Sequence, residues 1–190
     1  MHSALVKCAA ALLLLSCAGL VHAAAPWSTL EGCAYVPHNN NDGDSFHVRC
    51  GDDAFVLRLY FVDTPETNLQ YPERTREQAE HFGATLDDTL KAGKQAGAYV
   101  RDALKGPFTV VTRKATAAGR GKELRYYGMV HVGGRSLDEM LVLQGLARAK
   151  GVGAAVPGEK SRAHAERLRL LEVEAKRKGR GLWAAAAKKK

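Results

Sequence analysis

The sequence predicts an α+β fold in which short strands and amphipathic helices share one domain. β-Branched and aromatic residues gather in short runs bounded by Gly, Pro, Asn and Asp, a pattern typical of strands. Elsewhere apolar residues recur at steps of three and four, which indicates helices. Strands are expected at 29–36, 45–50, 54–61, 108–112 and 126–132, and helices at about 79–90, 94–104, 136–146 and 163–178.

Residues 1–24 are expected to be a signal peptide and not part of the fold. Lys7 precedes an apolar run over 9–21 that is too short to span a bilayer, and small residues follow at Val21-His22-Ala23. A lipoprotein signal is the alternative, because residues 14–17 resemble a lipobox and would anchor the chain through Cys17. Export to the periplasm or the medium is therefore predicted, without stable membrane association.

The mature chain is the right size for one domain and carries an excess of positive charge. The domain is expected over 25–183, followed by a disordered basic tail at 184–190. Because Lys7 is the only charged residue before Ala25, 27 Lys and Arg face 20 Asp and Glu, which gives a net charge of +7. That balance favours an anionic partner such as nucleic acid, although many soluble proteins are also basic.

Cysteine usage agrees with export. Cys8 and Cys17 belong to the expected signal peptide, which leaves Cys33 and Cys50 in the mature chain. An antiparallel hairpin of the first two strands would place these two residues nearly opposite one another. A disulfide is favoured in an oxidising compartment, and two unrelated buried thiols are the alternative.

Acidic residues gather at two turns. Asp42-Gly43 is a strong hairpin signal and presents Asp44 where the second strand begins. In Arg58-Leu-Tyr-Phe-Val-Asp63-Thr-Pro-Glu66-Thr, an arginine opens an apolar strand and two acids lie on the turn that the proline imposes. Carboxylates hold divalent cations and activate water, and a guanidinium neutralises phosphate, so the set suits phosphodiester cleavage. One such motif alone would be an ordinary acidic turn.

The motifs D-G-D-S and R-L-x-x-V-D-T-P-E-T together resemble the staphylococcal nuclease (thermonuclease) family. The likeness covers roughly 29–183 and includes L-x-x-Q-G-L-A at 141–147. It implies a five-stranded OB-fold barrel with about three helices and an endonuclease of low sequence specificity. Its substrates would be DNA and RNA, cut to leave 3′-phosphate ends, and the chain is expected to be a monomer. An insertion at about 68–92 departs from the family; a packed accessory helix is expected there, and a substrate gate is the alternative.

The resemblance also implies roles for particular residues. Asp44, Asp63 and the carbonyl of Thr64 resemble the calcium ligands of the family. Glu66 resembles the glutamate that holds the attacking water, usually assigned as general base. Arg58 would contact the phosphate and stabilise transition-state charge.

The second arginine of the family is assigned to Arg125, immediately before the fifth strand. Arg113 and Arg120 are rivals, because Glu123-Leu124 replaces the family's usual residues before it. The segment 150–153 lacks the tyrosines that line the base in the family archetype, so stacking of a base there is not expected, and Tyr126 or Tyr127 is the alternative.

Two other classes of protein remain open. A non-catalytic OB-fold module would bind nucleic acid without chemistry. A secreted domain stabilised by calcium would bind metal without nucleic acid. The retention of Asp44, Asp63 and Glu66 beside Arg58 favours the enzyme, because a binding module has no need for three acids beside a phosphate.

Overall fold

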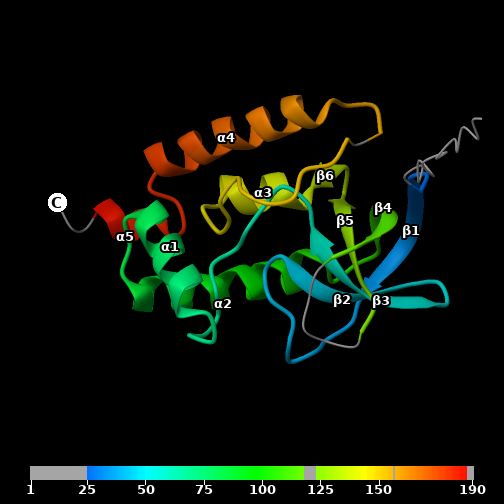
Figure 1. Cartoon of the computed structure of the whole chain (residues 1–190), viewed down its shortest axis with the longest axis horizontal. Coiled ribbons are helices and arrows are strands. Elements are labelled where there is room, and N and C mark those ends of the chain that lie inside the picture. The colour runs from blue at the N-terminus through cyan, green and yellow to red at the C-terminus, as the bar shows by residue number, and fades with distance from the viewer. Residues whose placement is uncertain (1–24, 118–122, 156, 188–190) are drawn as a thin grey trace, which may run out of the picture.

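The structure, a computed structural model, describes residues 25–117, 123–155 and 157–187. The expected signal peptide, the alternative anchor Cys17, the rival Arg120 and the last three lysines lie outside these residues. Figure 1 shows a β-barrel at one end of the molecule, with helices beside and above it. Within the described part of the chain, no helix is both long and apolar enough to cross a membrane.

The strands close into a barrel, which confirms the expected architecture. Neighbours follow the order β3-β2-β1-β4-β5-β6, and a further pairing of β3 with β5 closes a five-stranded mixed barrel. This closing pair is parallel, whereas the other pairs are antiparallel. The strands are β1 (Ser28–Tyr35), β2 (Ser45–Cys50), β3 (Asp53–Leu59), β4 (Phe108–Thr116), β5 (Arg125–Val132) and the two-residue β6 (Arg135–Ser136).

The helices complete two apolar clusters. Residues of α2, α3 and α4 join the barrel interior, whereas Phe82, Ala92, Ala175 and Trp183 form a second cluster that joins α1, α2, α4 and α5. The helices are α1 (Pro72–Phe82), α2 (Leu86–Ala103), α3 (Leu137–Leu143), α4 (Ser161–Arg177) and α5 (Trp183–Ala187).

The boundary between the inserted helix and the next one lies at Gly83, and the expected boundary between residues 90 and 94, at Gly93, is wrong. Gly83 ends α1 in the left-handed conformation (φ 67°), and the Thr85 hydroxyl accepts the Asp88 N–H at 3.1 Å at the start of α2. Gly93 instead lies inside α2, where an added Cβ would come within 2.3 Å of the Glu66 carbonyl oxygen. This glycine permits close packing and does not end a helix.

The third strand is shorter than expected. It ends at Leu59 and not at residue 61, because Phe61 takes a positive φ of 65° that is incompatible with a strand. The chain resumes pairing only at Asp63, which forms an isolated bridge with Arg148. At the other end of the chain, α5 extends through residue 187, into the segment expected to be a disordered tail. Alanine has the highest helix propensity, and Trp183 anchors the helix in the second cluster.

The first two strands form the expected hairpin, and the disulfide joins Cys33 to Cys50. Ala34 pairs with Arg49, so the two cysteines lie opposite one another in the same register. A crosslink of this kind typically stabilises a fold by about 2–4 kcal/mol, mainly by restricting the unfolded chain.

A buried ionic contact fastens α4 to α3. His164 is 1% exposed, and its Nε2 lies 2.5 Å from a carboxylate oxygen of Asp138, itself 3% exposed. The other ring nitrogen of His164, Nδ1, lies 3.3 Å from a carboxylate oxygen of Glu159 and 2.8 Å from Nη2 of Arg167. Burial and the charge of Arg167 lower the pKa of His164, but the hydrogen bonds with Asp138 and Glu159 and the charge of Asp138 outweigh them and raise it.

We therefore expect the contribution of His164 to stability to fall as pH rises. A pKa raised on folding gives stability that is complete below the unfolded pKa of about 6.5 and is lost as pH rises through the folded pKa. Urea unfolding of the protein and of His164→Gln should give a difference in free energy that shrinks toward alkaline pH. Asp138→Asn is the control and should weaken this dependence. A difference that grows with pH would contradict the expectation.

Candidate active site

The two aspartates of the sequence motifs are buried side by side. Asp44 follows a turn in which the Asp42 carboxylate accepts the N–H groups of residues 44 and 45, at 3.0 and 2.6 Å. Gly43 lets this turn pack on α2, because an added Cβ would lie 2.7 Å from that of Ala96. Asp44 then accepts the Thr64 N–H at 2.8 Å, which joins the β1–β2 loop to the segment after β3. Asp44 is 1% and Asp63 6% exposed.

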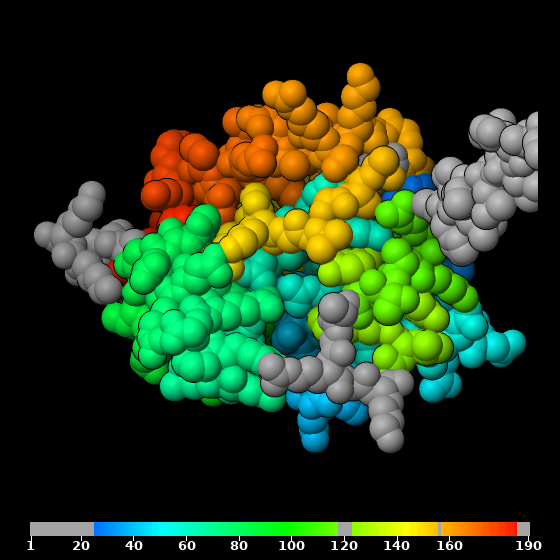
Figure 2. Space-filling view, viewed as in Figure 1, coloured from blue at the N-terminus to red at the C-terminus, as the bar shows by residue number. Residues whose placement is uncertain are grey.

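Arg58 bridges the two aspartates. Its Nη1 donates to Asp44 at 2.5 Å, and its Nη2 lies 3.5 Å from Asp63. The guanidinium keeps 16% of its side-chain surface exposed, so it faces both the acids and solvent. Figure 2 shows a hollow between the green surface of α1 and α2 and the yellow-green surface of β5, with atoms of earlier residues at its floor.

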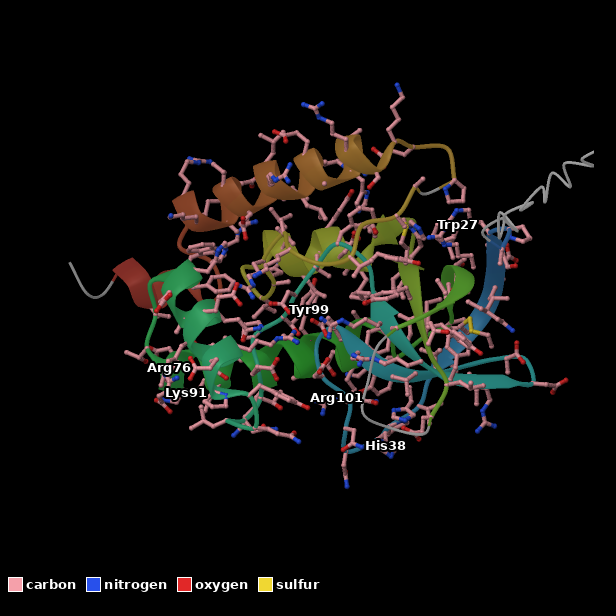
Figure 3. All side chains as sticks on the ribbon, viewed as in Figure 1. Trp27, His38, Arg76, Lys91, Tyr99 and Arg101 are labelled. Carbon is pink, nitrogen blue, oxygen red and sulfur yellow. A yellow bond between two sulfur atoms is a disulfide. The ribbon has the colours of Figure 1, made fainter. Side chains whose placement is uncertain are left out.

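Arg125 enters the same region from β5. Its Nη2 donates to the Ser45 hydroxyl at 2.6 Å. Ser45 directly follows Asp44 in the sequence. Ser45 pairs with Arg58 across β2 and β3, so the two arginines lie near each other. Burial and the positive charge of Arg58 lower the pKa of Arg125. Arg113, one of its rivals, instead lies over the ring of Trp27, 5.5 Å from the ring centroid; Figure 3 labels that tryptophan beside β1.

The Asp63 carboxylate collects more donors than the sequence suggested. Arg148 Nε donates to it at 2.7 Å and Gln78 Nε2 at 3.0 Å, and Arg74 donates to its other oxygen. Burial alone would raise the pKa of Asp63, but Arg74, Gln78 and Arg148 outweigh burial and lower it. Asp63 is therefore ionised throughout the physiological pH range.

Glu66 is held at the entrance to the same site. Arg74 Nε lies 2.8 Å from its carboxylate, and its backbone N–H donates to Gln78 at 2.8 Å. Burial raises the pKa of Glu66, Arg74 opposes the rise, and the charges of Asp44 and Asp63 add to it. The pKa of Glu66 is thus shifted toward neutral pH, as suits a general base.

Sequence reasoning missed three site residues, Arg74, Gln78 and Arg148. Arg74 and Gln78 are four residues apart on α1 and so lie on the same face of that helix. The inserted helix therefore packs on the second apolar cluster through Phe82 and also contacts Asp63 through these two side chains. Gln78 is fully buried, and its amide also donates to the Thr64 carbonyl at 2.9 Å. Their i,i+4 spacing soon after the acidic motif was the available signal. Arg148 could have been suspected because it directly follows the L-x-x-Q-G-L-A motif.

The arrangement joins hard oxygen ligands, a carboxylate of raised pKa and several guanidinium groups in one connected set of contacts. These are the parts needed to hold a cation, activate water and neutralise a phosphate. Comparison with protein-family models gives an independent result. The model of the staphylococcal nuclease homologues matches residues 56–185, which include Arg58, Asp63, Glu66 and Arg125, whereas Asp44 precedes the match. The match spans more than half of the chain, and the protein belongs to the staphylococcal nuclease family.

Proposed function

We propose that this protein is an exported, calcium-dependent endonuclease that hydrolyses DNA and RNA with low sequence specificity and leaves 3′-phosphate ends. The family indicates a nuclease and is typically metal-dependent. The observation that carries the proposal is that Arg58 contacts Asp44 and Asp63 while Arg74 links Asp63 to Glu66, so the three acids lie together. The net positive charge of the chain agrees with a polyanionic substrate.

The donor set fits calcium. Asp44, Asp63 and the Thr64 carbonyl would hold the ion, and all of these donors are hard oxygens, as calcium prefers. Each Asp44 oxygen and the Thr64 carbonyl accept one hydrogen bond from the described residues, which leaves a lone pair on each. Oδ2 of Asp63 already accepts from Arg148 and Gln78. The ion would therefore bind Oδ1, which accepts from Arg74. A bound calcium ion supplies positive charge next to the phosphate that is attacked.

Glu66 is the proposed general base. It would take a proton from water as the water oxygen bonds to phosphorus and the bond from phosphorus to the 5′-oxygen breaks. Its raised pKa favours proton transfer near neutral pH. Arg58 and Arg125 would bind the phosphate oxygens, where negative charge grows toward the transition state.

The inserted helix α1 would position and tune this site. Gln78 contacts Asp63, the Thr64 carbonyl and the Glu66 N–H, so one buried side chain fixes three groups with proposed roles. Arg74 joins Asp63 to Glu66 and neutralises part of their charge. A cation that binds Asp63 would have to compete with Arg74.

A plasmid and a single-stranded substrate, each with calcium or with a calcium chelator, test the proposed function. We expect cleavage with calcium and little with magnesium, because magnesium requires a tight octahedron and keeps its waters. Full activity in the chelator would refute calcium dependence. Binding of nucleic acid without cleavage would favour the OB-fold binding module. Calcium binding without nucleic-acid affinity would favour a secreted domain that calcium stabilises.

Substitution of the proposed catalytic groups should slow the chemical step while the fold persists. Glu66→Gln keeps the size of the side chain and removes the base, which typically costs about 10²–10⁴-fold in rate. Arg58→Ala and Arg125→Ala should also lower the single-turnover rate at saturating DNA, and lysine should not restore it fully because it lacks the planar fork.

Arg113→Ala is the matched control, and only a modest loss of binding is expected from it. Arg120→Ala tests the rival that the structure does not describe. A severe loss in Arg120→Ala with normal activity in Arg125→Ala would overturn the assignment of the second arginine. Activity that is equally slow in the parent and in all variants would refute the proposal that the protein is an enzyme.

Replacement of Arg74 should strengthen calcium binding. Arg74→Gln removes a positive charge in direct contact with Asp63, while Gln78 and Arg148 still hold that carboxylate. We expect calcium affinity to rise roughly tenfold, or about 1.4 kcal/mol, measured by calorimetry without nucleic acid. The control is Arg76→Gln on the same helix, an exposed arginine paired with Glu73 and labelled in Figure 3. Unchanged or weaker binding in Arg74→Gln would show that Arg74 does not compete with the ion.

A further inference from the structure

A cluster of possible metal ligands lies outside the acidic site. His38 belongs to the β1–β2 loop, His47 to β2, and Glu123 lies just before β5. One ligand atom from each lies within 4.8 Å of the others. His38 and Glu123 are exposed and His47 is partly buried, so the cluster is open to solvent. Figure 3 labels His38 at the edge of the barrel.

Hydrogen bonds of Asn41 fix which nitrogen of His47 carries a proton. The Asn41 amide nitrogen donates to the Val36 carbonyl at 2.9 Å, and its oxygen accepts the backbone N–H of His47 at 3.0 Å. The same oxygen lies 2.6 Å from His47 Nδ1. Since an amide oxygen only accepts, Nδ1 must carry a hydrogen and donate it.

The other nitrogen of His47 then faces a negative group. In a neutral ring with a protonated Nδ1, Nε2 offers a lone pair, and both carboxylate oxygens of Glu123 lie 3.3 Å from it. Lone pairs that face one another at this distance repel, so a positive charge between them would stabilise the contact. That charge is either a proton on Nε2 or a metal ion bound to both residues.

Three features favour a metal ion. Ligand atoms about 2.0–2.2 Å from a tetrahedral zinc lie roughly 3.3–3.6 Å apart, which matches the separation of His47 from Glu123. The Asn41 contact with Nδ1 is the hydrogen bond that a metal-binding histidine usually makes through its second nitrogen. The His38 ring lies against that of His47, with 4.0 Å between centroids, so a second imidazole is close by. Its Nδ1 accepts the Asn40 N–H at 3.2 Å in an exposed contact, and a zinc ion on Nδ1 would replace that hydrogen bond.

We propose that His38, His47 and Glu123 form a zinc site, separate from the proposed calcium site. Two imidazoles and one carboxylate suit zinc, with the fourth position left for water or another ligand. His47 and Glu123 also line a cavity of about 270 Å³ that adjoins this position. A bound ion would tie Glu123, two residues before Arg125, to the loop that carries Asp44. The site does not depend on the proposed nuclease activity.

Titration of the purified full chain with Zn²⁺ by calorimetry, with calcium in excess, tests the proposal. We expect one zinc per chain at this site, not displaced by calcium, and an affinity at least tenfold lower in His47→Ala, His38→Ala and Glu123→Gln. Co²⁺ provides a second readout, because tetrahedral coordination gives it a strong visible absorption that these variants should lose. Glu123→Gln alters an exposed side chain and should leave the fold intact.

The matched control is His81→Ala. His81 forms a comparable contact, with Nε2 3.0 Å from Glu172, and it lies outside the proposed zinc cluster. Its substitution should leave zinc binding unchanged. Failure of the parent to bind zinc, or equal binding by the parent and the three variants, would overturn the proposal. The charge on His47 Nε2 would then be a proton, and the contact with Glu123 an ordinary ion pair.

Discussion

The contacts of the Asp63 carboxylate join segments that are far apart in the sequence. A buried carboxylate is tolerated only when cations and hydrogen-bond donors compensate for lost hydration. Arg148 supplies a guanidinium that is itself only 3% exposed, and Gln78 supplies an amide from the inserted helix. Because each of these groups is buried with its partner, loss of any one would leave another polar group uncompensated. The segment after β3, the helix α1 and the segment after α3 are therefore fixed relative to one another.

Barrel closure places the two arginines. β3 and β5 pair in parallel, with Arg58 opposite Tyr127, so Arg125 lies two residues away on the same face of the sheet. Two guanidinium groups on one face repel each other, and this repulsion contributes to the lowered pKa of Arg125. An anionic phosphate between them would relieve the repulsion. The topology of the barrel thus brings these two positive charges together before any ligand binds, as the proposed phosphate contacts require.

Local patterns in the sequence were enough for the strands, the disulfide and the two acidic turns. They were less reliable at glycines, because a glycine that ends a helix and a glycine that permits close packing look alike in sequence. Gly93 was therefore taken as a helix boundary although it permits close packing, whereas Gly83 ends α1. Arg148 was missed because its contact with Asp63 spans 85 positions and follows only from the tertiary fold. Arg74 and Gln78 belong to an insertion for which the family resemblance offered no template.

The charges of the described site favour an anion and a cation that bind together. Four arginines, at positions 58, 74, 125 and 148, surround the carboxylates of Asp44, Asp63 and Glu66. Burial and the charge of Asp44 raise the pKa of Asp42. A calcium ion alone would approach four guanidinium groups, and a phosphate alone would approach the acids. Each ligand supplies the charge that the other lacks, so we expect the proposed calcium ion and the nucleic acid to strengthen each other's binding.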